Sequence, residues 1–110
     1  SLRTKSRQLG DLFISLVEEN RMGLELASPR EADMRGSHVS IRHPGGYAIM
    51  QALIERGVIG DFRAPDLLRF GFTPLYTRYF DVWQAVSTLA DIMNSNDWRD
   101  EKYAVQAEVT

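Results

Sequence analysis

The chain has 110 residues, which is enough for one domain with its own hydrophobic core. It contains no cysteine, which excludes disulfides, thiolate nucleophiles and zinc–sulfur sites and fits the reducing cytoplasm, where we expect the protein. The 13 lysines and arginines are dispersed and the formal net charge is −2, so we expect no nucleic-acid partner. Because no apolar run approaches the roughly 20 residues of a membrane span, we expect no membrane partner either.

The first predicted element is a helix over residues 2–20. Its apolar residues recur at spacings of three and four, which is typical of one buried stripe. The residues of this stripe are Leu9, Leu12, Phe13, Leu16 and Val17. Two strands are predicted next, over residues 24–27 and 37–42. The second strand alternates, so Val39 and Ile41 point to a core while His38, Ser40 and Arg42 point away from it.

A second helix is predicted over residues 47–56, with Ile49, Met50, Leu53 and Ile54 on its apolar side. A brief strand over residues 58–62 and a turn with the sequence RAPD lead into a longer strand over residues 67–72. A third helix is predicted over residues 81–93. The apolar stripe of this helix consists of Val82, Val86, Leu89, Ala90 and Met93.

This order of elements predicts an α+β two-layer sandwich, in which a small, mostly antiparallel sheet has helices packed on one face. The domain is expected to occupy residues 1–94. Residues 95–110 are polar with a weak pattern, which indicates a tail or a docked extension.

Arg69 is the main candidate for a functional residue. In the strand over residues 67–72, Leu68, Phe70 and Phe72 point to one face, and Arg69 points to the other, with Gly71 beside it. A guanidinium on a rigid strand suits bidentate binding of a carboxylate. The alternation by itself favours a simple surface arginine over a functional one. We expect no metal site, because His38 and His43 have no further ligands at suitable spacing.

Several motifs of the chain resemble the C-terminal segment of bacterial kynureninases. They are RGSHVSIRHPGGYAIMQALIERGVIGDFR and GDFRAPDLLRFGFTPLYTRYFDVWQAV, and within them the turn Arg63 to Pro65, Arg69 in LRFGF, and the PLY of residues 74–76 are the most specific. The resemblance covers nearly the whole chain. More broadly, it implies the small domain of a fold-type-I, aminotransferase-like enzyme that depends on pyridoxal phosphate.

The resemblance implies a function for the whole enzyme and a role for one residue. Kynureninases hydrolyse L-kynurenine to anthranilate and L-alanine in tryptophan catabolism, and Arg69 matches the arginine that binds the substrate α-carboxylate. The family also implies a homodimer and a large domain with a Schiff-base lysine. Lys5 and Lys102 are the two lysines here, and both lie in polar surroundings. We therefore expect the large domain to be absent and these 110 residues to be inactive alone, without bound pyridoxal phosphate.

Two alternatives remain open on the sequence. The chain could be the small domain of another fold-type-I enzyme, such as a cysteine desulfurase or an aminotransferase. It could also be a stand-alone binding module whose polar sheet face recognises an amino acid or a partner.

Overall fold

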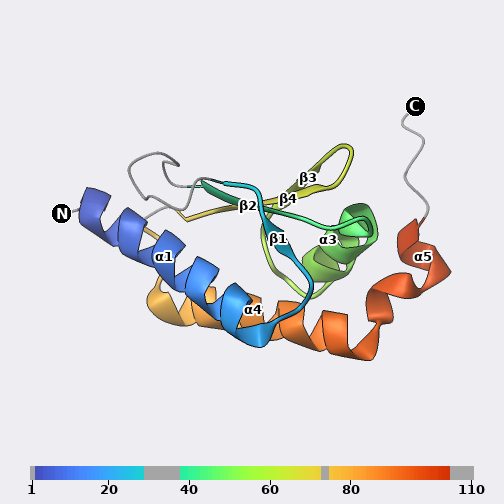
Figure 1. Ribbon diagram of the computed structural model, residues 1–110. Helices are drawn as coiled ribbons and strands as arrows, with labels where there is room; N and C mark the ends of the chain where they lie inside the picture. The colour runs from blue at the N-terminus through green and yellow to red at the C-terminus, as the bar shows by residue number, and fades with distance from the viewer. Residues whose placement is uncertain (1, 29–37, 73–74, 105–110) are drawn as a thin grey trace.

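The computed structural model describes residues 2–28, 38–72 and 75–104. It shows two layers, with an antiparallel sheet on one side and helices on the other (Figure 1). The elements in chain order are α1 (Leu2–Asn20), β1 (Glu25–Leu26), β2 (His38–Arg42), α3 (Gly46–Glu55), β3 (Asp61–Arg63), β4 (Leu67–Gly71), α4 (Tyr79–Ser95), the 3-10 helix η1 (Asp97–Arg99) and α5 (Glu101–Ala104). The predicted α+β class is confirmed.

The sheet has the strand order β1-β2-β4-β3, and all its pairs are antiparallel. Val39 lies opposite Phe70 and Ile41 opposite Leu68, and all four side chains are buried in the core. The alternate residues point away from the core, as the alternation of both strands predicted. The outward-facing pairs between β2 and β4 are His38 with Gly71, Ser40 with Arg69, and Arg42 with Leu67.

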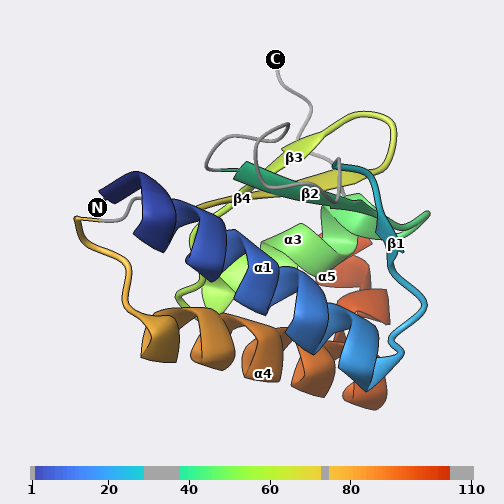
Figure 2. The ribbon, with the colours of Figure 1, turned by 60° about the vertical axis from the view of Figure 1, so that its left-hand side comes forward.

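The helices cover the inner face of the sheet. α1 and α4 run side by side in the same direction, and α3 lies between the sheet and α4 (Figure 2). Phe13 of α1 is at the centre of the core, with its ring centroid 4.9 Å from that of Phe70 and 5.3 Å from that of Phe72. The aromatic residues therefore join the helix layer to the middle of the sheet.

The predicted apolar stripes were correct in part. Ile14 and Ile92 are buried although neither was placed on a stripe, whereas Leu12, Leu16 and Met93 are only half-buried. Ile54, which was placed on a stripe, is 47% exposed. Ile14 and Ile92 are buried because α1 and α4 pack against each other as well as against other elements, so these two helices bury a wider arc than one stripe.

The ends of several elements differ from the predicted ones. β1 covers Glu25–Leu26 rather than residues 24–27, and α3 covers Gly46–Glu55 rather than residues 47–56. β3 begins at Asp61 rather than at residue 58, and α4 extends two residues further at each end than predicted. β4 ends at Gly71 rather than at residue 72. α3 stops where Gly57 takes φ +89°, a conformation that residues with a Cβ rarely adopt.

The segment after α4 packs against α3. The ring of Trp98 lies so close to Gly45 that any Cβ at this position would overlap it. Tyr103 is 9% exposed, and its hydroxyl donates a hydrogen bond of 2.8 Å to Glu55. This segment is thus docked as far as α5.

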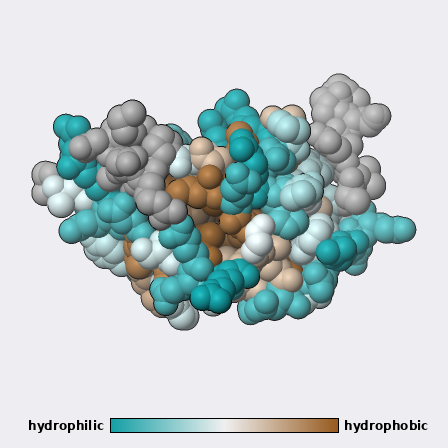
Figure 3. Space-filling model, viewed as in Figure 1, coloured by the Kyte–Doolittle hydropathy of each residue, from teal (hydrophilic) through white to brown (hydrophobic). Residues whose placement is uncertain are grey.

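The surface has an uneven distribution of apolar residues. Figure 3 shows apolar side chains in the middle of one face, surrounded by hydrophilic ones.

Within the described ranges, no helix combines the length and the hydropathy of a membrane-spanning segment.

Candidate functional site

Arg69 lies on the outward face of the sheet, near its middle. Its strand, β4, is bordered by β2 and β3, so the backbone of Arg69 is held from both sides. Its cross-strand neighbours are Ser40 on β2 and Asp61 on β3. The helices of the described ranges pack on the opposite, buried face. The position is therefore rigid at the backbone and open at the side chain.

Asp61 binds the guanidinium of Arg69 through two hydrogen bonds. Nε donates to Oδ1 and Nη2 donates to Oδ2, both at 2.9 Å. The hydrogen bond from Arg69 lowers the pKa of the Asp61 carboxyl, and the charges of Arg69, Arg63 and His38 lower it further against an opposing effect of burial. The same hydrogen bond raises the pKa of the Arg69 guanidinium. Both groups are therefore charged at neutral pH.

Asp61 was not predicted from the sequence as a partner of Arg69. A signal was present, because β3 and β4 form a hairpin around residues 64–66. In a hairpin centred on Pro65, residues at equal distance from the centre face each other, which pairs Asp61 with Arg69. The predicted strands, over residues 58–62 and 67–72, place the centre of the turn half a residue before Pro65, which shifts the pairing between the strands by one residue.

Other charged side chains lie on the same face as Arg69. The imidazole ring of His38 lies beside Gly71. A Cβ added to Gly71 would be 3.4 Å from this ring, so the ring borders the space that a side chain at Gly71 would occupy. Arg63 is exposed at the end of β3, and Nε of Arg42 lies 3.6 Å from Oδ1 of Asp66. We call His38, Arg42, Arg63 and Arg69 the cationic face, with Asp61 as the carboxylate bound within it.

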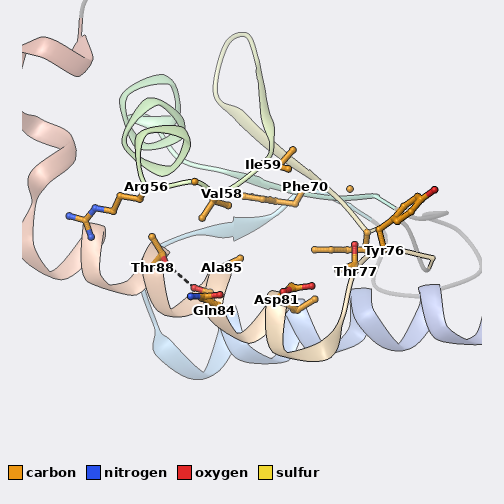
Figure 4. A pocket seen from close by; sticks show the side chains of 14 residues that line it. Arg56, Val58, Ile59, Phe70, Tyr76, Thr77, Asp81, Gln84, Ala85 and Thr88 are labelled. Atoms are coloured by element: carbon orange, nitrogen blue, oxygen red, sulfur yellow. Dashed lines mark hydrogen bonds between the residues drawn. The ribbon is translucent and has the colours of Figure 1, made fainter.

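A groove of about 630 Å³ lies elsewhere, between the segment after α3, the end of β4 and the start of α4 (Figure 4). Phe70, Val82 and Val58 form its apolar floor, and the strongly exposed Ile59 and Tyr76 lie at its margin. Arg69 is not among the residues that line it. The groove is thus a different surface from the cationic face, and it contains no residue that the sequence analysis proposed for binding.

The remaining titratable candidates have structural partners. His43 Nδ1 accepts the backbone N–H of Gly45 at 2.9 Å, and burial, together with the charge of Arg99, lowers the pKa of this imidazole. Within the ranges that the structure describes, no three His, Cys, Asp or Glu side chains are grouped closely enough to hold a metal ion. A hydrogen bond with Tyr103 and the charge of Glu55 raise the pKa of Lys102, which is the direction opposite to that of a Schiff-base lysine.

Comparison with known proteins identifies the family. Residues 2–89 match the family described as the kynureninase C-terminal domain. This chain belongs to the kynureninase C-terminal domain family. The kynureninases of Burkholderia mallei (strain SAVP1), Burkholderia pseudomallei (strain K96243) and Pseudomonas fluorescens are each 54% identical to it over 112 aligned positions.

These alignments cover 100% of this chain and 27% of each relative. The chain thus spans about a quarter of the length of the curated kynureninases that it matches. The resemblance inferred from the motifs is confirmed. The match also favours a kynureninase domain over the cysteine desulfurase, the aminotransferase and the stand-alone module that the sequence had left open.

Proposed function

We propose that this kynureninase C-terminal domain supplies Arg69 as the residue that binds the α-carboxylate of L-kynurenine in a full-length, cytoplasmic, homodimeric enzyme. The observation that carries the proposal is the 54% identity to kynureninases along the whole chain. The geometry supports it, because Arg69 is held on a central strand with its guanidinium on the open face of the sheet. The reaction of the full-length enzyme is hydrolysis of L-kynurenine to anthranilate and L-alanine.

The role of Arg69 in this reaction is binding and orientation. A guanidinium forms two parallel, charge-assisted hydrogen bonds to a carboxylate, which fixes the direction of the bound amino acid as well as its position. A substrate held in one orientation reaches the reactive geometry without a further entropy cost. The domain thus contributes to the reaction by positioning the substrate.

The chain's own residues do not fit the requirements of pyridoxal phosphate. The cofactor needs a lysine with a lowered pKa, whereas the pKa of Lys102 is raised and Lys5 lies on the surface of α1 beside the start of α4, where its charge helps to lower the pKa of Asp81. We therefore assign the cofactor and the chemical step to the part of the enzyme that these 110 residues do not span. The division at residues 94 and 95 remains part of this proposal.

The test is anthranilate release from L-kynurenine, measured by fluorescence, with the full-length enzyme that contains this domain. We expect turnover by the full-length enzyme, and neither turnover nor an aldimine absorbance from the isolated 110-residue chain with added pyridoxal phosphate. Release of sulfur from cysteine, or transamination without anthranilate release, would assign the enzyme to another reaction. An aldimine absorbance from the isolated chain would show that the cofactor lysine is on this domain.

A further inference from the structure

Asp61 and Arg69 are held opposite each other by the sheet itself. They are a register pair of the β3–β4 hairpin, in which Arg63 also pairs with Leu67. The position of the carboxylate relative to the guanidinium is therefore set by main-chain pairing close to a tight turn, and the two hydrogen bonds of 2.9 Å complete the contact.

The two hydrogen bonds use one edge of the guanidinium only. A guanidinium has five N–H groups, and Asp61 accepts one from Nε and one from Nη2. The N–H groups that remain are both of those on Nη1 and one on Nη2, which together form the end of the side chain. Within the part of the chain that the structure describes, Asp61 is the acceptor found for this side chain. A second carboxylate can therefore bind end-on while Asp61 stays in place.

The stability of the fold does not account for this pair. The Arg69 side chain is 32% exposed and that of Asp61 is 52% exposed, and exposed ion pairs contribute little to folding. Neither side chain caps a helix. The contact does restrict a long, flexible side chain to one orientation, and binding groups held in one orientation lose less entropy when a ligand binds.

The surrounding charges make a second carboxylate acceptable beside Asp61. Two anions at one guanidinium repel each other, which would weaken such a site. Arg63 lies two residues from Asp61 on the same face of β3, and its charge lowers the pKa of the Asp61 carboxyl. Arg63 therefore adds a positive charge beyond that of Arg69, which Asp61 neutralises.

We propose that Asp61 is a positioning residue for the substrate, an inference that rests on the proposed carboxylate-binding role of Arg69. By holding the edge formed by Nε and Nη2, Asp61 presents the end of the Arg69 guanidinium to the α-carboxylate of the amino acid. The two carboxylates bind the same guanidinium at the same time, one from the domain and one from the substrate. Asp61 thereby contributes to the selection of substrates that carry an α-carboxylate at this position.

The experiment is steady-state kinetics of the full-length enzyme with Asp61→Asn, which keeps the shape of the side chain but removes the charge and one of the two acceptors. We expect KM for L-kynurenine to rise about ten-fold, with a smaller change in kcat, because the orientation of Arg69 is lost while its charge remains. Inhibition by anthranilate, which has no α-amino-acid carboxylate, is expected to stay within about two-fold. Asp61→Glu, which keeps two acceptors, is expected to recover part of the loss.

Two further variants test whether Asp61 acts through Arg69. In an Arg69→Ala background, Asp61→Asn is expected to have no additional effect on KM, since the carboxylate has no guanidinium left to orient. Asp97→Asn is the matched control, because it breaks an exposed pair with Arg56 that involves neither Asp61 nor Arg69, and it is expected to leave KM unchanged. Melting curves of every variant exclude unfolding as the cause of a changed KM.

The outcomes distinguish the two proposals. An unchanged or lowered KM in Asp61→Asn would overturn the positioning role, and a lowered KM would show that Asp61 competes with the substrate for Arg69. An undiminished effect of Asp61→Asn in the Arg69→Ala background would also overturn it. If Arg69→Ala itself leaves KM unchanged, the carboxylate-binding role of Arg69 fails, and the positioning role fails with it.

Discussion

The two faces of β4 differ in what they contribute to the molecule, although they are formed by neighbouring residues. Phe70 is 2% exposed and packs against Phe13, so it belongs to the core. Arg69, one residue earlier, is on the outward face, and its contact is with the exposed carboxylate of Asp61. The inner face contributes buried apolar side chains to the core, while the outer face has polar groups that are partly exposed.

The exposed arginine–aspartate pairs show the same distinction. Arg78 and Asp81 also form two side-chain hydrogen bonds, of 3.2 and 2.8 Å. In this pair, however, Asp81 Oδ2 also accepts the backbone N–H of Arg78 at 2.8 Å, at the start of α4. This pair therefore stabilises a helix terminus. The two hydrogen bonds that Asp61 accepts from Arg69 both come from the side chain, and neither comes from the backbone. Similar side-chain chemistry stabilises a helix terminus at one place, whereas at the other we propose that it serves binding.

The largest expected effect is on the inner face. Phe70→Ala removes a buried aromatic ring and leaves a cavity beside Phe13, so we expect the free energy of unfolding to fall by about 3–5 kcal/mol. Urea denaturation of the 110-residue chain measures this change. A loss below about 1 kcal/mol would show that the core is less tightly packed than the ring distances indicate.

The next effect is on the outer face and concerns activity. Arg69→Ala in the full-length enzyme is expected to lower kcat/KM by about ten- to several-hundred-fold, because a bidentate charge-assisted contact with the substrate is lost. The melting temperature is expected to change by less than about 2 °C, since a half-buried side chain on the outward face of the sheet contributes little to the core. Arg69→Lys is expected to recover only part of the activity, because an ammonium group has no planar fork.

Kinetics and melting curves on both variants test this comparison. Retention of near-normal efficiency in Arg69→Ala would contradict the binding role. A loss of activity that follows the melting curve would instead assign Arg69 to the fold, and the two faces of β4 would then not differ in the way described.

A smaller effect is expected at the start of α4. Asp81→Asn weakens the hydrogen bond to the Arg78 backbone, so we expect the melting temperature to fall by about 2–5 °C at pH 7 with no change in KM. The side-chain hydrogen bond from Arg78 lowers the pKa of Asp81 below its ordinary value of 3.8. The stabilisation is therefore fully present above this ordinary pKa and is lost as the pH falls through the lowered one.

Melting curves of wild type and Asp81→Asn between pH 2 and pH 7 measure this dependence. The difference between the two proteins is expected to be constant at the upper end and to disappear at the lower end. A difference that persists at the lower end would mean that the carboxylate form is not the source of the stabilisation.

The smallest effect is expected for the pair between α3 and η1. Arg56 and Asp97 are both substantially exposed, with side chains 37% and 48% accessible. We expect Asp97→Asn to shift the melting temperature by less than about 2 °C, because the docked segment is held mainly by Trp98 and Tyr103. A larger shift in a melting curve would show that this ion pair holds the segment on α3.

The sequence was most informative where the period of a pattern was short and strict. The alternation of residues 38–42 and 67–71 placed every side chain of β2 and β4 on the correct face, including Arg69. The helical stripes were less reliable. Ile14 and Ile92 are buried because their helices have several neighbours, and the number of neighbours cannot be read from one helix.

The candidate site was predicted only in part for a related reason. The motif identified Arg69, and the alternation predicted the sheet face on which its side chain lies. The predicted boundaries of the hairpin, however, would pair Phe62 with Leu67. The observed pairing is Phe62 with Leu68, which moves Asp61 from a position opposite Leu68 to one opposite Arg69. A shift of one residue in register exchanges the faces of a strand, so a small error in the turn was enough to miss the partner of Arg69.

The sequence by itself determined the α+β class, the order of the elements, the face of each central strand and the resemblance to kynureninases. These properties follow from local periodicity and from motifs of contiguous residues, which need no knowledge of distant contacts. The tertiary structure alone decided that Asp61 holds the guanidinium of Arg69, that the groove lies apart from the cationic face, and that Trp98 and Tyr103 dock on α3. Each of these depends on the register of a pairing or on the packing of segments far apart in the chain, and neither is encoded in a pattern within one element.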